Sequence, residues 1–162
     1  MSEIVNDELQ FMDEDTQTGK FLIFTLGEEN YGIEIKYVIE IIGIQKITEV
    51  PDMPDYINGV INLRGKIIPV MDVRIRFGKE TRAYDDRTCI IVIEVEGVTI
   101  GLIIDTVLEV VVIPEEMMLP PPSVGQGFHH KYIKGIGKSG EDVKLILDCD
   151  KLLGEDELEM LN

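Results

Sequence analysis

A glycine-rich run, Gly135-Ile136-Gly137-Lys138-Ser139-Gly140, is the strongest candidate in this sequence for phosphate chemistry. A nucleotide-binding loop leads into a helix, because the amides at the helix N-terminus bind the phosphate. Here the run is followed by the β-forming residues Val143-Lys144-Leu145-Ile146-Leu147, and the first glycine of a P-loop is replaced by Tyr132. The sequence therefore favours a plain hairpin turn over a phosphate site.

Two further pairs of residues could do chemistry. Asp148 and Asp150 would share a face if the preceding strand continued, as acid–base or cation chemistry requires. An aspartate between a strand and a short helix more often caps the helix, and we interpret Asp148 in that way. His129 and His130 are adjacent, so their side chains diverge, and no third ligand lies at a metal-site spacing. We therefore expect no catalytic residues, no metal and no cofactor.

The two cysteines, Cys89 and Cys149, lie far apart inside apolar segments. That placement favours reduced, buried thiols over a disulfide framework, and it assigns them no redox role.

Charge and composition narrow the classes of partner. The chain has 162 residues, 44% of them hydrophobic, so it can fold around a core. Its 15 Lys and Arg stand against 31 Asp and Glu, giving a net charge of −16. Such a chain repels nucleic acid and anionic membranes. No apolar run approaches the roughly 20 residues that span a bilayer, and the N-terminus is acidic, so we expect a cytoplasmic protein without membrane insertion.

The pattern along the chain predicts a mainly β body. Residues 1–19 read as a flexible acidic leader, residues 20–162 as the folded part, and residues 155–161 as a short C-terminal helix. Residues 36–42 could form one or two helical turns. Four hairpins are expected, with strands at 21–26 and 31–35, 59–63 and 66–71, 88–95 and 98–104, and 132–137 and 142–147.

An internal repeat divides this body. A shift of 76 residues places Tyr56-Ile57-Asn58-Gly59-Val60 on Tyr132-Ile133-Lys134-Gly135-Ile136. A shift of 69 places Gly32 on Gly101. The sequence therefore predicts two similar β units at about 20–85 and 86–154, with a surface insertion in the second around 114–127.

One hairpin stands out as a recognition candidate. In the run from Asn62 to Asp72, Gly65 suits a tight turn and Pro69 points to a sheet edge or bulge. Arg64 at the turn presents five hydrogen-bond donors with little room to be buried. It can be read as a solubilising turn residue, or as part of a recognition surface together with Glu40.

Several runs resemble the bacterial chemotaxis adaptor family CheW: Tyr31-Gly32-Ile33-Glu34-Ile35, Val38-Ile39-Glu40-Ile41, Gly59-Val60-Ile61-Asn62-Leu63-Arg64-Gly65, Pro69-Val70-Met71-Asp72 and Arg74-Ile75-Arg76-Phe77. The likeness extends over about residues 20–161. It implies two packed SH3-like five-stranded β-barrel subdomains with short helices, and no enzymatic activity. It also implies a scaffold that couples the cytoplasmic tip of methyl-accepting chemoreceptors to the regulatory domain of the histidine kinase CheA. Such a protein would be monomeric when isolated and recruited to membrane-associated receptor arrays.

Carried over residue by residue, the resemblance implies receptor contacts at Val38, Glu40, Ile41, Asn62, Arg64 and Cys89. It implies kinase contacts at Ile47, Thr48 and Gly59. A second kinase contact falls on Ser123 and Val124, where the family pattern of a charged residue followed by an aromatic is missing.

Other functions stay open at this point. One is an adaptor of a pilus-type chemosensory pathway. Another is a small enzyme or ligand-binding barrel that uses Asp148, Asp150 and the glycine turn. A nucleic-acid barrel would rest on the bases between Arg64 and Arg87, where only Phe77 and Tyr84 supply aromatic platforms.

Overall fold

The computed structural model describes residues 18–121 and 131–154. Its strands are β1 Lys20–Leu26, β2 Glu29–Glu34, β3 Val38–Gly43, β4 Ile57–Leu63, β5 Lys66–Asp72, β6 Cys89–Val95, β7 Val98–Ile104, β8 Thr106–Val112, β9 Met118–Leu119, β10 Ile133–Ser139 and β11 Asp142–Leu147. Its helices are α3 Val73–Arg76, α4 Cys149–Leu153 and the 3-10 helices η1 Ile35–Tyr37 and η2 Glu115–Met117. No helix in this described part of the chain is long and apolar enough to cross a membrane.

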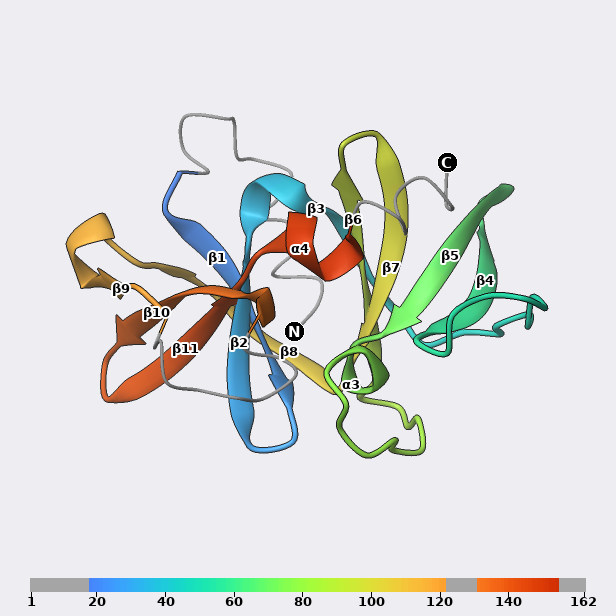
Figure 1. The fold of residues 1–162 in the computed structure, drawn as a ribbon, viewed down its shortest axis with the longest axis horizontal. Coiled ribbons are helices and arrows are strands. Elements are labelled where there is room, and N and C mark those ends of the chain that lie inside the picture. The colour runs from blue at the N-terminus through green and yellow to red at the C-terminus, as the bar shows by residue number, and fades with distance from the viewer. Residues whose placement is uncertain (1–17, 122–130, 155–162) are drawn as a thin grey trace.

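The strands form two sheets that lie side by side (Figure 1). One sheet has six strands in the order β8-β1-β2-β11-β10-β9, and the other has five in the order β3-β6-β7-β5-β4. The expected mainly β fold with two packed units is therefore confirmed. The units are open sheets rather than closed five-stranded barrels. In the five-stranded sheet, the chain leaves the ladder after β3 and rejoins the opposite edge only at an isolated bridge between Thr48 and Val60.

All four expected hairpins are present, because each has turn residues that suit two-residue loops. The expected helical turns over residues 36–42 are wrong: η1 ends at Tyr37, and β3 follows. A bulge between Val38 and Glu40 places Val38 and Ile41 against the same core, so a strand mimics helical spacing. The edge strand β8 was not anticipated from the sequence.

The internal repeat appears as repeated structure. The amide of Asp72 donates to the carbonyl of Tyr56 at 2.8 Å, and that of Asp148 donates to the carbonyl of Tyr132 at 2.7 Å. Each aspartate then caps the short helix that follows, as expected for Asp148. The two sheets do not coincide with the sequence units predicted at 20–85 and 86–154, because each sheet takes strands from both units. β1 and β2 pair with strands from the C-terminal half, and β6 and β7 with strands from the N-terminal half.

Equivalent glycines lie where parallel strands meet. Gly101 of β7 opposes Val70 of β5, and Gly32 of β2 opposes Ile146 of β11. A Cβ on Gly101 would lie 3.0 Å from the Val70 side chain, and one on Gly32 would lie 2.9 Å from that of Ile146. Only a residue without a side chain lets these strands pair with the neighbouring aliphatic groups in place.

The main core fills the space between the sheets. Four rings run through it in contact, with centroids 5.9 Å apart for Phe24 and Tyr31, 5.5 Å for Tyr31 and Phe77, and 5.5 Å for Phe77 and Tyr132. All four side chains are buried. Because burying a large apolar side chain contributes about 1.5–3 kcal/mol, this row holds the two sheets together.

Candidate functional site

Glu40 and Arg64 form an ion pair across the open edges of the five-stranded sheet. Glu40 lies on β3, opposite Val92 of β6, whereas Arg64 lies in the turn between β4 and β5. The ion pair therefore joins β3, at one edge of the sheet, to the turn that follows β4 at the other edge. The Arg64 side chain is 70% exposed and that of Glu40 is 24% exposed, so the guanidinium has donors left to face solvent.

The turn that carries Arg64 is fixed by its backbone. Arg64 has φ 52° and Gly65 has φ 87°, the left-handed pair that a type I′ hairpin requires. The amide of Gly65 donates to Oδ1 of Asn62 at 2.8 Å, which closes the turn from inside. Asn62 is exposed and therefore contributes both to the turn and to the surface around Arg64.

The three expected apolar contacts, Val38, Ile41 and Cys89, face the main core, whereas Glu40 faces the other side of the sheet with its pairing partner Val92. Val38 and Cys89 are half-buried beside the main core, whereas Ile41 is only 4% exposed and belongs to that core. Of these three expected receptor contacts, Val38 and Cys89 offer accessible surface. Ile41 supports β3 from below.

Both cysteines are free thiols, as expected. The Cys89 thiol donates to the carbonyl of Arg87 at 3.3 Å, and burial raises its pKa. Burial also raises the pKa of Cys149 to about 12. Both sulfurs are therefore protonated near neutral pH and poor nucleophiles.

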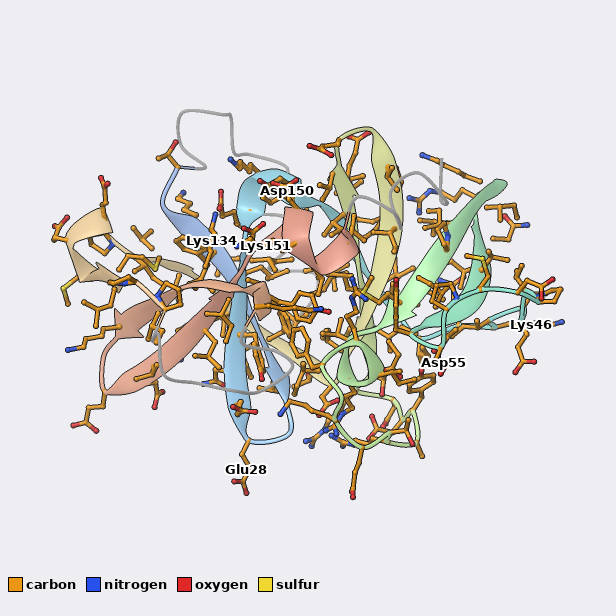
Figure 2. The ribbon with its side chains drawn as sticks, viewed as in Figure 1. Glu28, Lys46, Asp55, Lys134, Asp150 and Lys151 are labelled. Carbon is orange, nitrogen blue, oxygen red and sulfur yellow. The ribbon has the colours of Figure 1, made fainter. Side chains whose placement is uncertain are left out.

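Ile47, Thr48 and Gly59 lie together on the outer end of the same sheet. Thr48 and Val60 exchange both backbone hydrogen bonds, each 2.9 Å long. Gly59 has φ 151°, and a Cβ there would lie 2.2 Å from the Thr48 carbonyl oxygen. Ile47 packs against the small core inside this sheet, and the preceding residue, Lys46, projects outward beside β4 (Figure 2).

β4 thus positions both groups of expected contacts. Its middle carries Gly59 and the bridge to Thr48, and its end leads through Asn62 into the turn with Arg64. The structure brings together Glu40 with Arg64 and, separately, Ile47 with Thr48 and Gly59. Ser123 and Val124 lie outside the described residues, as do His129 and His130, residues 1–17 of the expected leader and the whole of the expected C-terminal helix.

A buried polar cluster around Asp105 was missed by the sequence reasoning. Asp105 accepts hydrogen bonds from Arg74 Nε at 2.8 Å, Arg74 Nη2 at 2.5 Å, Arg82 Nη1 at 3.0 Å and the Gly27 amide at 2.8 Å. Burial alone would raise the pKa of Asp105, but these donors and the two guanidinium charges hold it below its usual range. The sequence shows a group of basic residues that includes Arg74 and Arg82, but it does not indicate that Asp105, more than 20 residues away, is their partner.

The alternative chemical sites do not assemble among the described residues. Gly135 to Ser139 lie in β10, and a turn at Gly140 leads directly into β11 rather than into a helix. Asp148 accepts from the Lys151 amide at 3.2 Å as a cap, and Asp150 is exposed on α4 (Figure 2). The described part of the chain contains no group of three His, Cys, Asp or Glu side chains that could hold a metal.

Comparison with known proteins gives consistent matches. The family model "CheW-like domain" matches residues 20–157. The chemotaxis protein CheW of Klebsiella aerogenes is 37% identical over 88% of this chain and 86% of its own length. That of Treponema pallidum is 35% identical over 97% of this chain and 89% of its own. The crystal structure of the scaffolding protein TtCheW from Thermoanaerobacter tengcongensis superposes with a TM-score of 0.80. It is 39% identical and covers 88% of this chain and 97% of that one.

Proposed function

This chain belongs to the CheW-like family, and we propose that it works by binding alone, holding the cytoplasmic tip of a chemoreceptor and the regulatory domain of the kinase CheA at two separate surfaces. It is a chemotaxis scaffold that couples receptors to that kinase. Its place is the cytoplasm, at membrane-associated receptor arrays, and the isolated chain is a monomer. No catalytic step is assigned to any of its residues.

The proposed receptor surface combines the ion pair with the neighbouring turn and with apolar positions of β3 and β6. It comprises Val38, Glu40, Ile41, Asn62, Arg64 and Cys89. The observation that carries this assignment is the ion pair between a mostly exposed guanidinium and Glu40 of β3, with Val38 and Cys89 half-buried on β3 and β6. A helical hairpin tip presents apolar residues at helical spacing, which fit an apolar floor with a polar rim.

An exposed ion pair adds only about 0–1 kcal/mol to stability, so Glu40 and Arg64 are not needed to hold the fold. Their value lies in recognition, because the pair fixes the Arg64 side chain in one direction and leaves donors free. Electrostatic complementarity at such a rim sets specificity more than affinity.

The proposed kinase surface is the bridge region of Ile47, Thr48 and Gly59, beside the middle of β4. Here Gly59 allows the backbone of Thr48 to lie directly on β4. An exposed sheet edge suits packing against another β module, and the regulatory domain of CheA is expected to be one. Ser123 and Val124 are proposed as a second, weaker kinase contact.

Calorimetric titration of this chain with the isolated regulatory domain of CheA from the same source tests the proposal. We expect saturable one-to-one binding at micromolar affinity or better. Absence of binding between two folded proteins would contradict the adaptor function. The alternative of a small ligand-binding barrel would then have to be tested.

A further inference from the structure

The loop between α3 and β6 reaches back to β4 through one side chain, Tyr84. Its hydroxyl donates to Oδ2 of Asp72 at 2.7 Å and accepts from the side-chain amide of Asn58. Asp72 is only 3% exposed, and its other oxygen accepts from the Arg74 amide at 2.9 Å. The hydrogen bonds from Asn58 to Tyr84 and from Tyr84 to Asp72 therefore end on a carboxylate that is itself fixed in place.

The direction of these hydrogen bonds depends on a neutral phenol. Burial raises the pKa of Tyr84 most, and the hydrogen bond to Asp72 raises it further. The hydroxyl thus keeps its proton near neutral pH and donates to the carboxylate while its oxygen accepts from Asn58.

Asn58 occupies the irregular position of β4. Ile57 opposes Met71 and Gly59 opposes Val70, so Asn58 is the extra residue of a bulge. A bulge turns the strand locally and sets the direction of the residues beside it. The residue immediately after Asn58 is Gly59, which lies against the Thr48 carbonyl.

The other repeat has the same bulge with a different anchor. Lys134 is equivalent to Asn58, and the ladder shifts there between Ile133 and Gly135. Lys134 forms an ion pair with Glu34 of β2. In both repeats, a side chain from another element therefore holds the bulge residue, although the chemistry of the contact differs.

We propose that Tyr84 is a positioning residue for the kinase-binding surface: its hydroxyl, seated on Asp72, holds Asn58 so that Gly59 and Thr48 keep their close approach. This proposal rests on the proposed function of the bridge region. Tyr84 acts through Asn58, and its own contact with the kinase is not required.

The loop does not depend on this hydroxyl alone. Arg82 donates to Asp105 at 3.0 Å and to Asp85 at 3.2 Å, which ties the same loop to the body at a second point. Tyr84→Phe therefore removes the hydroxyl and leaves the loop attached. Arg82→Gln does the reverse and serves as the matched control.

The test measures binding of the full chain to the CheA regulatory domain by calorimetry, and hydrogen exchange at the amides of Thr48 and Val60. A hydrogen bond to a charged group contributes enough to change an equilibrium by about tenfold or more. We expect Tyr84→Phe to bind about five- to tenfold more weakly, with binding to a receptor hairpin peptide unchanged. We expect the two amides to exchange faster while those of β6 and β7 keep their rates. Arg82→Gln should bind within about twofold of the unmodified chain.

Unchanged affinity and unchanged exchange in Tyr84→Phe would overturn the proposal, as would exchange that accelerates equally throughout β6 and β7. If Tyr84→Phe fails to fold, Asn58→Ala replaces it. This variant removes the amide that donates to the Tyr84 hydroxyl and keeps the hydrogen bond from Tyr84 to Asp72, and it should show the same weaker kinase binding and faster exchange. If the unmodified chain itself does not bind the kinase domain, the proposed function fails. Exchange at Thr48 and Val60 still decides the role of Tyr84.

Discussion

At the scale of single residues, the proposed receptor surface centres on one side chain that the fold does not need. Arg64 is 70% exposed, and its backbone conformation is set by the turn and by Asn62 rather than by its guanidinium. Replacing the side chain therefore changes the chemistry of the surface without removing a core contact.

Arg64→Glu is expected to leave the fold intact and to abolish receptor coupling. The substitution replaces a cation that faces Glu40 with a second carboxylate, and the two like charges repel. The stability change should stay within about 1 kcal/mol, because the lost pair is exposed. Thermal unfolding measures the first effect, and binding to a receptor hairpin peptide measures the second.

Lys138→Glu is the control for Arg64→Glu. It makes the same change of charge at an exposed site on β10, in the other sheet. It should bind the receptor peptide as the unmodified chain does. Unchanged receptor binding by Arg64→Glu would remove Arg64 from the site, and equal loss in both variants would point to net charge instead.

Residue-level predictions succeeded where the partners lie close in sequence. The cap at Asp148 could be anticipated because cap and helix are neighbours. The contact of Glu40 with Arg64 was anticipated only as an option, and it is present. Tyr84 with Asp72, and Asp105 with its arginines, could not be anticipated, because an irregular loop has no period that tells where its side chains point.

At the scale of elements, the hairpins could be predicted and the sheets could not. A two-residue turn such as Glu96-Gly97 indicates that the strands on either side of it pair with each other. The parallel pairs β5 with β7 and β11 with β2 join strands far apart in the chain, and no local pattern encodes them. The sequence also does not predict β8, because the residues of this edge strand are partly exposed and lack a clear alternation of apolar and polar side chains.

Gly59→Ala should destroy the kinase surface and spare the receptor surface. The added Cβ would lie 2.2 Å from the Thr48 carbonyl oxygen, so the bridge segment must move away from β4. We expect a loss of stability of about 1–3 kcal/mol, typical of overpacking. Binding to the CheA regulatory domain should fall at least tenfold, measured by calorimetry.

Gly43→Ala provides the matched control for Gly59→Ala. It lies at the end of β3, and a Cβ there would meet nothing within 4 Å. It should bind the kinase domain normally. Normal kinase binding by Gly59→Ala would exclude the bridge region as the contact, whereas a defect in both variants would show that these glycines matter for another reason.

At the scale of the whole molecule, a few polar contacts reinforce the shared core between the repeats. Arg76 of α3 donates to the carbonyl of Leu152 in α4 at 2.9 Å and lies over the equivalent rings of Tyr56, 4.0 Å away, and Tyr132, 5.1 Å away. Asp105 joins the β1–β2 turn of one sheet, through Gly27, to α3 beside the other sheet, through Arg74. The repeat was readable from the sequence, but these contacts between its halves were not.

Asp105 should make the stability of the whole chain depend on pH in acid. Its folded-state pKa lies below the usual value, so its contribution is complete above the unfolded pKa of about 3.9 and is lost as the pH falls through the folded value. Asp105→Asn removes the charge that faces Arg74 and Arg82. Because the Asp105 side chain is only 8% exposed, the variant should lose on the order of 3 kcal/mol near pH 7.

Denaturant unfolding of Asp105→Asn and of the unmodified chain at pH 7 and near pH 3 measures this. The difference between the two proteins should shrink toward pH 3, because below the unfolded pKa of about 3.9 the unfolded chain takes up a proton that the native carboxylate resists. Asp86→Asn, at an exposed position of the loop that carries Arg82, should show no such difference at either pH. A difference that is equally large at both pH values would mean that Asp105 acts through the shape of its hydrogen bonds and not through its charge.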